Sequence, residues 1–219
     1  MPTKVLVADD HSIIRQGLCA LLEKQPGIEI VGAVEDGQKA IELVRELSPD
    51  IVIMDVTMPN LNGIDATRKI IDQLPGVKVI ALSMHSSGRF VAEMLKAGAS
   101  GYLLKECLFD ELVEAIRTVL SGGIYLSHKI TGVVVEDYVK RMSSKIQAEG
   151  PALTERGREV LQLLAEGKST KQIALQFHVS DKTIESTRRN IMEKLGIYTV
   201  AGLTKYAIRE GLTPLEFQN

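Results

Sequence analysis

The first half of the chain alternates short, almost wholly apolar runs with longer segments whose apolar residues recur every three or four positions. The short runs are typical of strands buried on both faces of a sheet. They cover residues 5–8, 28–34, 51–54, 77–83 and 101–104. The longer segments have helical periodicity and cover residues 13–23, 38–47, 64–73, 89–97 and 108–120. Five βα units of this length predict an open parallel sheet with helices on both faces.

Gly122-Gly123 ends this alternation, and the rest of the chain has helical periodicity only. Residues 127–147 predict a linker helix with one apolar stripe, whose members are Ile130, Val133, Val134, Tyr138 and Met142. Ser143-Ser144 and Gly150-Pro151 are typical of a break before a second domain. The chain therefore reads as an α/β domain, a linker and an all-α domain.

The segment after this break predicts four short helices. Ser169, with Gln172 three residues later, is a capping-box signal for the second helix, over residues 170–177. A tight connection then leads into a longer third helix that runs to about residue 195, and Thr199 begins the fourth. A short helix, a tight turn and a longer helix form a helix-turn-helix unit.

Charge is distributed unevenly between the two halves. Residues 1–127 carry 12 Lys and Arg against 17 Asp and Glu, whereas residues 151–219 carry 10 against 8. The acidic half suits a metal site, and the mildly basic tail permits nucleic-acid binding without proving it. Cys19 and Cys107 form no Cys-x-x-Cys pair, which argues against a disulfide or zinc framework. Because no apolar stretch is long enough to span a membrane, we expect a soluble, cytoplasmic protein.

Polar side chains follow four of the predicted strands, at the point where each strand ends. They are Asp9, Asp10, Asp55, Ser83 and Lys105. Open parallel sheets bind ligands outside the carboxyl ends of their strands, so we expect these groups to converge. Three carboxylates, a hydroxyl and an ammonium suit a Mg²⁺ ion and a phosphoryl group. Acidic residues also end strands as helix caps or turn formers, but that interpretation is weak for five residues on four strands.

This chemistry predicts a role for each residue. Asp10 and Asp55 would bind Mg²⁺ directly, and Asp9 would bind it through a water molecule. Asp55 would also act as the nucleophile toward the phosphoryl group. Lys105 would neutralise charge on that group, and Ser83 would donate a hydrogen bond to one of its oxygens.

These residues and their spacing resemble the receiver domain of two-component response regulators, over residues 4–120. The matching pattern is Asp9-Asp10, Asp55-x-x-Met58-Pro59-x-x-x-Gly63, Ser83 and Gly101-Tyr102-Leu103-Leu104-Lys105. The resemblance implies a flavodoxin-like sheet of order 2-1-3-4-5 and a sensor histidine kinase as the phosphoryl donor. It also implies that the Thr57 backbone carbonyl binds Mg²⁺ and that Ser83 and Tyr102 form a switch pair. His11 and His85 flank this site. A proton-transfer or metal role is conceivable for them, but histidine is more often a polar neighbour or a helix-start residue, and we assign neither a catalytic role.

Residues 147–212 resemble the LuxR-type DNA-binding domain of NarL/FixJ-type response regulators, with the helix-turn-helix motif at about 170–189. The matching residues are Glu159-Val160-Leu161, Ala165-x-Gly167, Ile173-Ala174, Val179-Ser180, Thr183-Ile184 and Asn190-Ile191-x-x-Lys194-Leu195. With the receiver included, the two resemblances leave residues 121–146 as a linker, part of which is the helix described above.

The third helix of this domain should divide into an inward stripe and a DNA face. Its periodicity places Ile184, Ile191 and Leu195 inward. The opposite face can enter a major groove. The expected DNA contacts are Lys182, Thr183, Glu185, Ser186, Arg188, Arg189 and Lys194. Arg189 suits guanine O6 and N7, whereas the two lysines and Arg188 suit phosphates.

Three positions depart from the LuxR-type pattern. Glu185 and Thr187 stand where that family usually has a basic residue and a histidine, and Gly157 stands where a glutamate is usual. Glu185 either accepts a hydrogen bond from cytosine N4 or repels the DNA backbone. These two interpretations leave the preferred DNA sequence open.

The two halves together predict a transcription regulator whose DNA binding is switched by phosphorylation of Asp55. Such a protein is a phosphoacceptor rather than an enzyme, and catalyses at most its own phosphorylation and dephosphorylation. Two alternatives stay open. One is an aspartyl-phosphate phosphatase, although Thr57 replaces the second carboxylate that such an enzyme uses. The other is a receiver that acts without phosphorylation.

The expected partners are a sensor histidine kinase, double-stranded promoter DNA, a second copy of the chain and RNA polymerase. A homodimer is expected in the active state because one helix reads only a half-site. The last helix, with Leu203, Tyr206 and Ala207, is one candidate dimer surface. The receiver helices are another.

Overall fold

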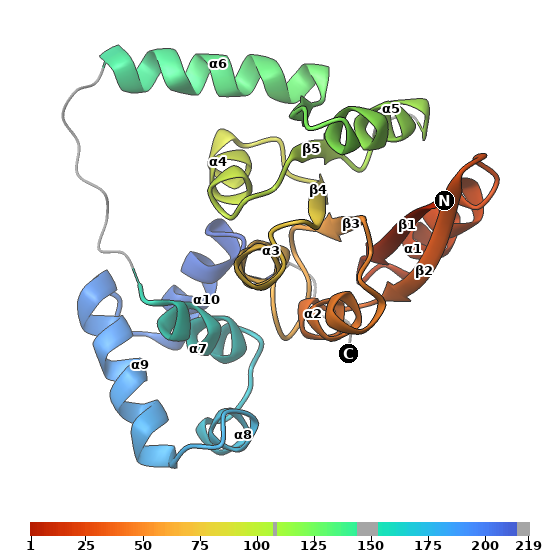
Figure 1. Cartoon of the computed structure of the whole chain (residues 1–219). Coiled ribbons are helices and arrows are strands. Elements are labelled where there is room, and N and C mark those ends of the chain that lie inside the picture. The colour runs from red at the N-terminus through yellow and green to blue at the C-terminus, as the bar shows by residue number, and fades with distance from the viewer. Residues whose placement is uncertain (107–108, 144–152, 214–219) are drawn as a thin grey trace. The chain divides into compact units, whose positions relative to one another are not determined.

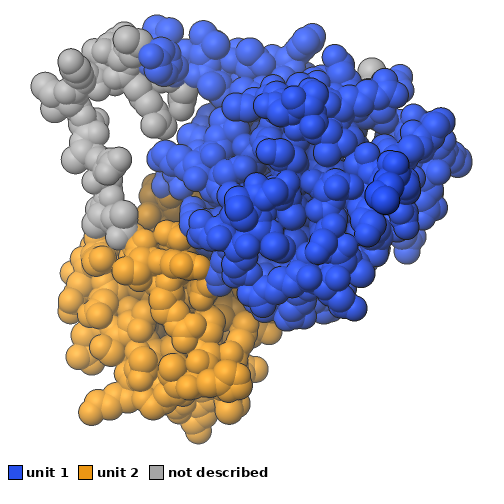
Figure 2. Space-filling view, in the orientation of Figure 1, with its two compact units in different colours: residues 1–58, 62–145 blue, residues 59–61, 146–219 orange. Residues whose placement is uncertain are grey.

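The computed structural model describes residues 1–106, 109–143 and 153–213 (Figure 1). The chain divides into two compact units, which are coloured separately in Figure 2. One unit holds residues 1–58 and 62–145, and the other holds residues 59–61 and 146–219. The predicted break at Gly150-Pro151 and the predicted boundary between residues 146 and 147 lie outside the described residues.

The first unit is a parallel α/β sheet, as the alternating pattern predicts. Its strands are β1 Thr3–Ala8, β2 Ile28–Val34, β3 Ile51–Asp55, β4 Lys78–Ser83, β5 Gly101–Leu104 and β6 Tyr125–Leu126. The helices that follow the first five are α1 Ser12–Leu22, α2 Gly37–Leu47, α3 Gly63–Gln73, α4 Gly88–Lys96 and α5 Phe109–Leu120. The strand order is β2-β1-β3-β4-β5-β6 with every pair parallel, which confirms the predicted 2-1-3-4-5 order.

Alternate residues of each central strand face opposite layers of helices. Val7, Ile53 and Leu82 belong to a buried cluster with α1 and α5, to which Leu22 and Ile116 contribute. The intervening strand residues are also buried, and α2, α3 and α4 contact the strands as well. Both faces of the sheet are therefore covered, which explains why the strands are apolar throughout.

A sixth strand and a long helix occupy the segment predicted as the linker. Tyr125 pairs with Gly101 across β5 and β6, and this two-residue strand is too short to produce a pattern in the sequence. Helix α6, His128–Ser143, follows and packs against α4. The predicted apolar stripe is only partly correct, because Ile130 is buried whereas Tyr138 is 63% exposed. The side chain of Met142 lies outside the description.

The described residues of the second unit form four helices, as predicted: α7 Glu155–Ala165, α8 Thr170–Gln176, α9 Asp181–Leu195 and α10 Val200–Arg209. Hydroxyl side chains cap the N-termini of all four helices. At the start of α8, Ser169 and Gln172 form the predicted capping box. His178, at φ 52°, makes the tight turn between α8 and α9. These caps fix where each helix begins, since their side-chain oxygens accept the free backbone N–H groups.

The core of the second unit corrects one expectation about α10. Leu203 and Ala207, offered above as part of a dimer surface, are 1% and 0% exposed and pack in a cluster with Val160 and Leu161 of α7. Tyr206 is half-buried against the same cluster. Helical periodicity identifies an apolar stripe but does not say whether a neighbouring helix or a second protein covers it. Here the covering element is α7.

Candidate functional site

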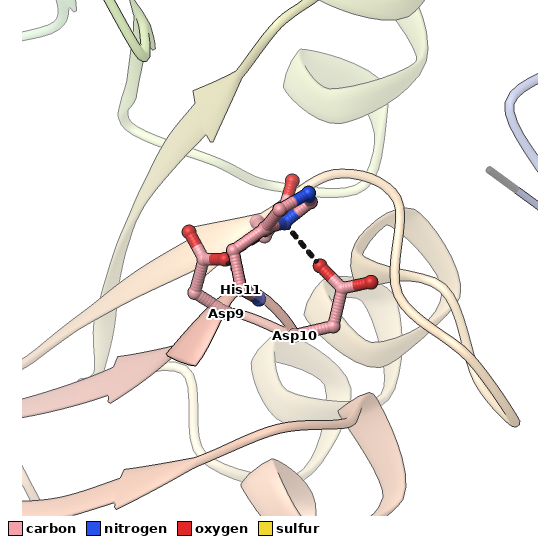
Figure 3. A group of neighbouring side chains, drawn as sticks. Asp9, Asp10 and His11 are labelled. Atoms are coloured by element: carbon pink, nitrogen blue, oxygen red, sulfur yellow. Dashed lines mark hydrogen bonds and ion pairs between the residues drawn. The ribbon is translucent and has the colours of Figure 1, made fainter. Parts of the chain in front are cut away.

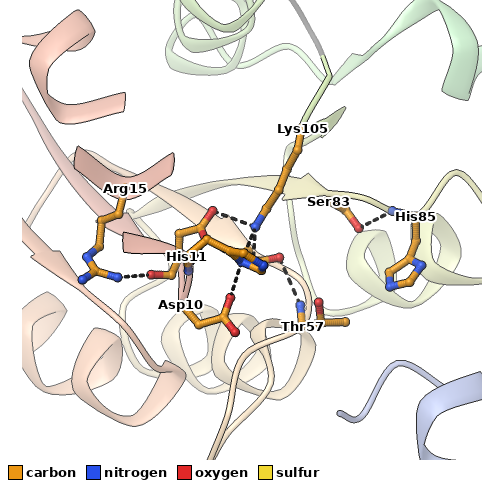
Figure 4. A network of polar contacts seen from close by, with 9 residues as sticks. Asp10, His11, Arg15, Thr57, Ser83, His85 and Lys105 are labelled. Carbon is orange, nitrogen blue, oxygen red and sulfur yellow. Dashed lines mark hydrogen bonds and ion pairs between the residues drawn. The ribbon is translucent and has the colours of Figure 1, made fainter. Parts of the chain in front are cut away.

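The ends of β1, β3, β4 and β5 bring the predicted polar residues together at one edge of the sheet. Ala8 pairs with Met54 and Asp55 pairs with Leu82, so the residues that follow these strands lie side by side. Figure 4 shows the side chains of this cluster pointing toward one another from separate strands. The convergence expected from the sequence is therefore present.

Lys105 is the centre of the ion pairs in this cluster. Its Nζ atom lies 2.6 Å from Asp55 Oδ2 and 2.8 Å from Asp9 Oδ2. The side chain of Lys105 is 2% exposed, and those of both aspartates are 1% exposed. The backbone N–H of Thr57 donates to Asp55 Oδ1 over 3.2 Å. One oxygen of the Asp55 carboxylate thus faces Lys105, and the other is held by the loop after β3.

His11, which the sequence placed beside the site without a catalytic role, belongs to the cluster. Its Nδ1 atom lies 2.7 Å from Asp10 Oδ1 and 3.3 Å from Asp9 Oδ1. Figure 3 marks the contact between the His11 ring and Asp10. The same nitrogen lies 3.9 Å from Asp55 Oδ2. The signal that could have identified it is its position directly after Asp9-Asp10, where the chain turns from β1 into α1.

Burial and like charges perturb the acid–base properties of the cluster. Desolvation is the main cause that raises the pKa of Asp55 to about 8, and Asp9 and Asp10 raise it further while Lys105 opposes them. Burial alone would lower the pKa of Lys105, but its attraction to Asp55 and Asp9 outweighs burial and raises it. Three carboxyl groups face one ammonium, so a bound cation would favour ionisation of Asp55 and relieve the repulsion among them.

The donor atoms fit a divalent cation. Asp9, Asp10, His11 and Asp55 each offer one ligand atom, and these four atoms all lie within 4.8 Å of one another. Asp9 Oδ2 and Asp10 Oδ1 are buried, and their close contacts are the ion pairs with Lys105 and His11. Carboxylate oxygens are the ligands that Mg²⁺ prefers. The cluster therefore has the donor atoms and the spacing that an ion would use.

The predicted switch residues lie beside the cluster. The backbone N–H of His85 donates to Ser83 Oγ over 3.0 Å, and the hydroxyl of Tyr102 donates to the His85 carbonyl over 2.8 Å. Tyr102 is fully buried, and burial raises its pKa to about 12. Because β6 flanks β5, this ring does not lie at the edge of the sheet. Both residues thus contact His85, whose ring stacks on Phe90.

The structure explains why a glycine, Gly63, stands eight residues after Asp55. Its N–H donates to the Val56 carbonyl over 2.9 Å, and a Cβ atom at this position would collide with the Asp55 carbonyl oxygen. Only glycine allows α3 to begin so close to the end of β3. This residue therefore shapes the loop that carries Thr57.

Helix α9 of the second unit exposes most of the residues that we expect to contact DNA. Ile184 and Ile191 are buried, as expected, while Leu195 is half-buried. The exposed positions are Lys182, Thr183, Glu185, Ser186, Arg189 and Lys194, and Arg188 is half-buried. The hydroxyl of Thr187 donates to the Thr183 carbonyl within the helix. The face opposite the core is therefore polar along the whole helix.

Comparisons with known proteins match both units. Residues 5–117 match the response regulator receiver domain, and residues 151–207 match the luxR family of bacterial regulatory proteins. The chain is 37% identical over 207 residues to the transcriptional regulatory protein DegU of Brevibacillus brevis, covering 89% of this chain and 88% of that protein. It is 36% identical over 218 residues to the oxygen regulatory protein NreC of Staphylococcus aureus, covering 98% and 100%.

A solved structure shows the same architecture. RcsB of Salmonella enterica serovar Typhimurium, bound to a promoter in the presence of phosphomimetic BeF₃⁻, is 26% identical with a TM-score of 0.60, covering 97% of this chain and 100% of that one. Among the described helices, none has both the length and the apolar character needed to cross a membrane. The chain belongs to the two-component response regulators of the NarL/FixJ type, and it is a DNA-binding transcriptional regulator with a receiver domain and a LuxR-type helix-turn-helix domain.

Proposed function

We propose that Asp55 accepts a phosphoryl group from a sensor histidine kinase and that this modification controls DNA binding. The observation that carries this proposal is the convergence of Asp55 with Asp9, Asp10 and Lys105 at the carboxyl edge of the sheet. An Asp55 oxygen would attack the phosphorus atom of a phosphohistidine. The P–N bond would break, and its electron pair would stay on the histidine nitrogen of the kinase.

The surrounding residues support this transfer in separate ways. Asp10, Asp55 and the Thr57 carbonyl would hold Mg²⁺ directly and Asp9 through water, and the ion would neutralise charge on the phosphoryl oxygens. Lys105 is already within 2.6 Å of Asp55, so a small movement would place its ammonium on the incoming group. Ser83 would exchange its bond from the His85 N–H for a bond to a phosphoryl oxygen. The protein would thus catalyse its own phosphorylation and dephosphorylation.

The start of the linker gives the phosphorylated site a direct connection to α6. The Ser127 N–H donates to the Tyr102 carbonyl over 3.1 Å, and Lys129 Nζ lies 2.6 Å from Glu106 Oε1. Tyr102 is therefore bonded to the residue that precedes α6, and Glu106, which follows Lys105, is bonded to the first turn of α6. A shift of these residues on phosphorylation would change how α6 packs against α4.

The DNA contacts of the proposed function come from α9. Arg189 would read guanine in the major groove, and Lys182, Arg188 and Lys194 would bind phosphates. Thr183, Glu185 and Ser186 would lie at the base edges. RcsB has been solved as dimers on DNA, and we infer a homodimer on paired half-sites for this chain as well. RNA polymerase would be the further partner at the promoter.

Phosphoryl labelling tests the proposal. We expect the full chain to be labelled at Asp55 when it is mixed with Mg²⁺ and acetyl phosphate, with the adduct located by mass spectrometry after borohydride reduction. Asp55→Asn should abolish labelling, and Asp72→Asn, which removes an exposed carboxylate on α3, should not. The labelled wild type should also bind promoter DNA more tightly than the unlabelled protein. Labelling that survives Asp55→Asn would refute the assignment.

A further inference from the structure

We propose that His11 is a fourth protein ligand in the receiver metal site, binding through Nδ1, and that it makes the site prefer borderline first-row ions such as Ni²⁺ and Zn²⁺ over Mg²⁺. This inference rests on the metal site of the proposed function and concerns which ions that site selects. It assigns a role to a residue that the sequence places beside the site without deciding what it does.

The distances around His11 are those of a shared coordination shell. In an octahedral shell with bonds of about 2.1–2.2 Å, neighbouring ligand atoms lie about 3.0 Å apart and opposite ones about 4.3 Å apart. His11 Nδ1 lies 2.7, 3.3 and 3.9 Å from oxygens of Asp10, Asp9 and Asp55. His11 Nδ1 is thus near enough to Asp10 and Asp55 for an ion held by those two carboxylates to reach it as well.

The shortest contact of the His11 ring is with Asp10. The His11 ring nitrogen lies 2.7 Å from Asp10 Oδ1, in an ion pair that a metal ion bound by both atoms would replace. Two ligand atoms that face a common point in this way are suited to bind one cation between them. The ring contributes from the solvent side, since the His11 side chain is 48% exposed.

The backbone holds His11 in place while the ring stays free to adjust. The His11 N–H donates to Asp9 Oδ1 over 2.8 Å, and the His11 carbonyl accepts from the Arg15 N–H in the first turn of α1. The residue is thus anchored between two elements of the site. Its ring lies 3.4 Å from Lys105 Nζ and would separate from that ammonium as a cation enters.

An imidazole changes the order of metal preference. Mg²⁺ favours oxygen ligands and retains waters, so one nitrogen adds little to its binding. Imidazole suits Ni²⁺, Cu²⁺ and Zn²⁺, whose affinities for mixed nitrogen and oxygen sites exceed that of Mn²⁺. A site whose direct ligands include an imidazole beside the carboxylates should therefore be more sensitive to these ions than a site of oxygens alone.

Direct metal binding by the full chain at one fixed pH tests the inference. We would bind Mn²⁺ and record electron spin-echo modulation, which detects a directly coordinated ¹⁴N nucleus, and would measure Ni²⁺ and Mg²⁺ dissociation constants by calorimetry. The variants are His11→Asn, which keeps a polar group of similar reach, and His128→Asn, which removes an exposed histidine at the start of α6 as a control.

We expect a ¹⁴N signal in the wild type and in His128→Asn but not in His11→Asn. The Ni²⁺ dissociation constant should rise about tenfold or more in His11→Asn, while the Mg²⁺ constant changes less than about threefold. Mn²⁺ binding without a ¹⁴N signal, with an unchanged ratio of Ni²⁺ to Mg²⁺ affinity in His11→Asn, would overturn the inference but leave Asp55 labelling intact. Failure of the wild type both to bind any divalent ion and to label Asp55 would overturn the inference and the proposed function together.

Discussion

The receiver cluster and the exposed face of α9 use similar charged side chains in opposite environments. Asp9 and Asp55 are 1% exposed and Lys105 is 2% exposed, whereas Lys182 and Arg189 on α9 face solvent. Buried charges depend on one another, because removing one leaves its partner desolvated and unpaired. Exposed charges are screened by water and salt and act nearly independently. A substitution should therefore be far more damaging in the first region than in the second.

Lys105→Gln should have the largest effect. Without its ammonium, three carboxylates repel the incoming phosphoryl group, and we expect the rate of labelling by acetyl phosphate and Mg²⁺ to fall about 10²- to 10³-fold. Lys182→Gln removes the same charge from α9 and should label at the wild-type rate. Circular dichroism would verify that both variants are folded. A rate for Lys105→Gln close to that of the wild type would remove the distinction between the two regions.

Arg189→Ala should have the next largest effect, on DNA rather than on labelling. Loss of a bidentate contact to guanine costs about 1–3 kcal/mol, so specific affinity should fall roughly 5- to 150-fold. Fluorescence anisotropy at constant salt, on a duplex selected from random sequences with phosphorylated protein, measures this. Lys205→Ala removes an exposed charge from α10 and is the control. An equal loss on cognate and unrelated duplexes would show that Arg189 binds phosphates only.

Mg²⁺ binding should depend on pH because the Asp55 carboxyl keeps its proton up to about pH 8 in the metal-free fold, against an ordinary pKa of 3.8. The unfolded chain loses this proton first, so the free energy of unfolding falls as pH rises between these values and then levels. Mg²⁺ binds the ionised carboxylate, and its dissociation constant should fall about tenfold per pH unit below pH 8. Calorimetric titration from pH 6 to 9 measures the slope, which Asp55→Asn should flatten.

Glu185→Gln should have the smallest effect. Removing one exposed negative charge from the DNA face should strengthen binding to unrelated duplexes a few-fold, because less repulsion opposes the phosphates. The same anisotropy assay, repeated at two salt concentrations, measures the change. If affinity instead falls for the cognate duplex alone, Glu185 accepts a hydrogen bond from a cytosine. Asp181→Asn provides a matched control at the first residue of α9.

Long and regular elements were predicted from the sequence more accurately than short ones. Strand β2 and strand β5 have the predicted bounds because their apolar runs end at polar or glycine residues. The two residues of β6 escaped prediction because a strand this short has no periodicity, and its pairing with Gly101 and Tyr102 is a long-range contact. The N-terminal cap at Ser169 was predictable, since capping is a local interaction.

The candidate site shows the same division between local and long-range information. The positions of Asp9, Asp55 and Lys105 at strand ends were sufficient to predict their convergence, because parallel strands share a carboxyl edge. The close approach of the His11 ring to these carboxylates could not be predicted in this way, since it depends on the turn between β1 and α1 and on which way the ring points. The burial of Leu203 likewise depends on how α10 packs against α7.

The sequence by itself determined the order of strands and helices, the capped helix-turn-helix and the identity of the strand-end residues, since these follow from periodicity and local chemistry. Only the tertiary structure decided which charges are desolvated, and thus why the pKa of Asp55 is raised while exposed charges on α9 stay in water. It also decided that an imidazole faces the carboxylates. The physical reason is that burial and electrostatic coupling depend on distances between groups that are far apart along the chain.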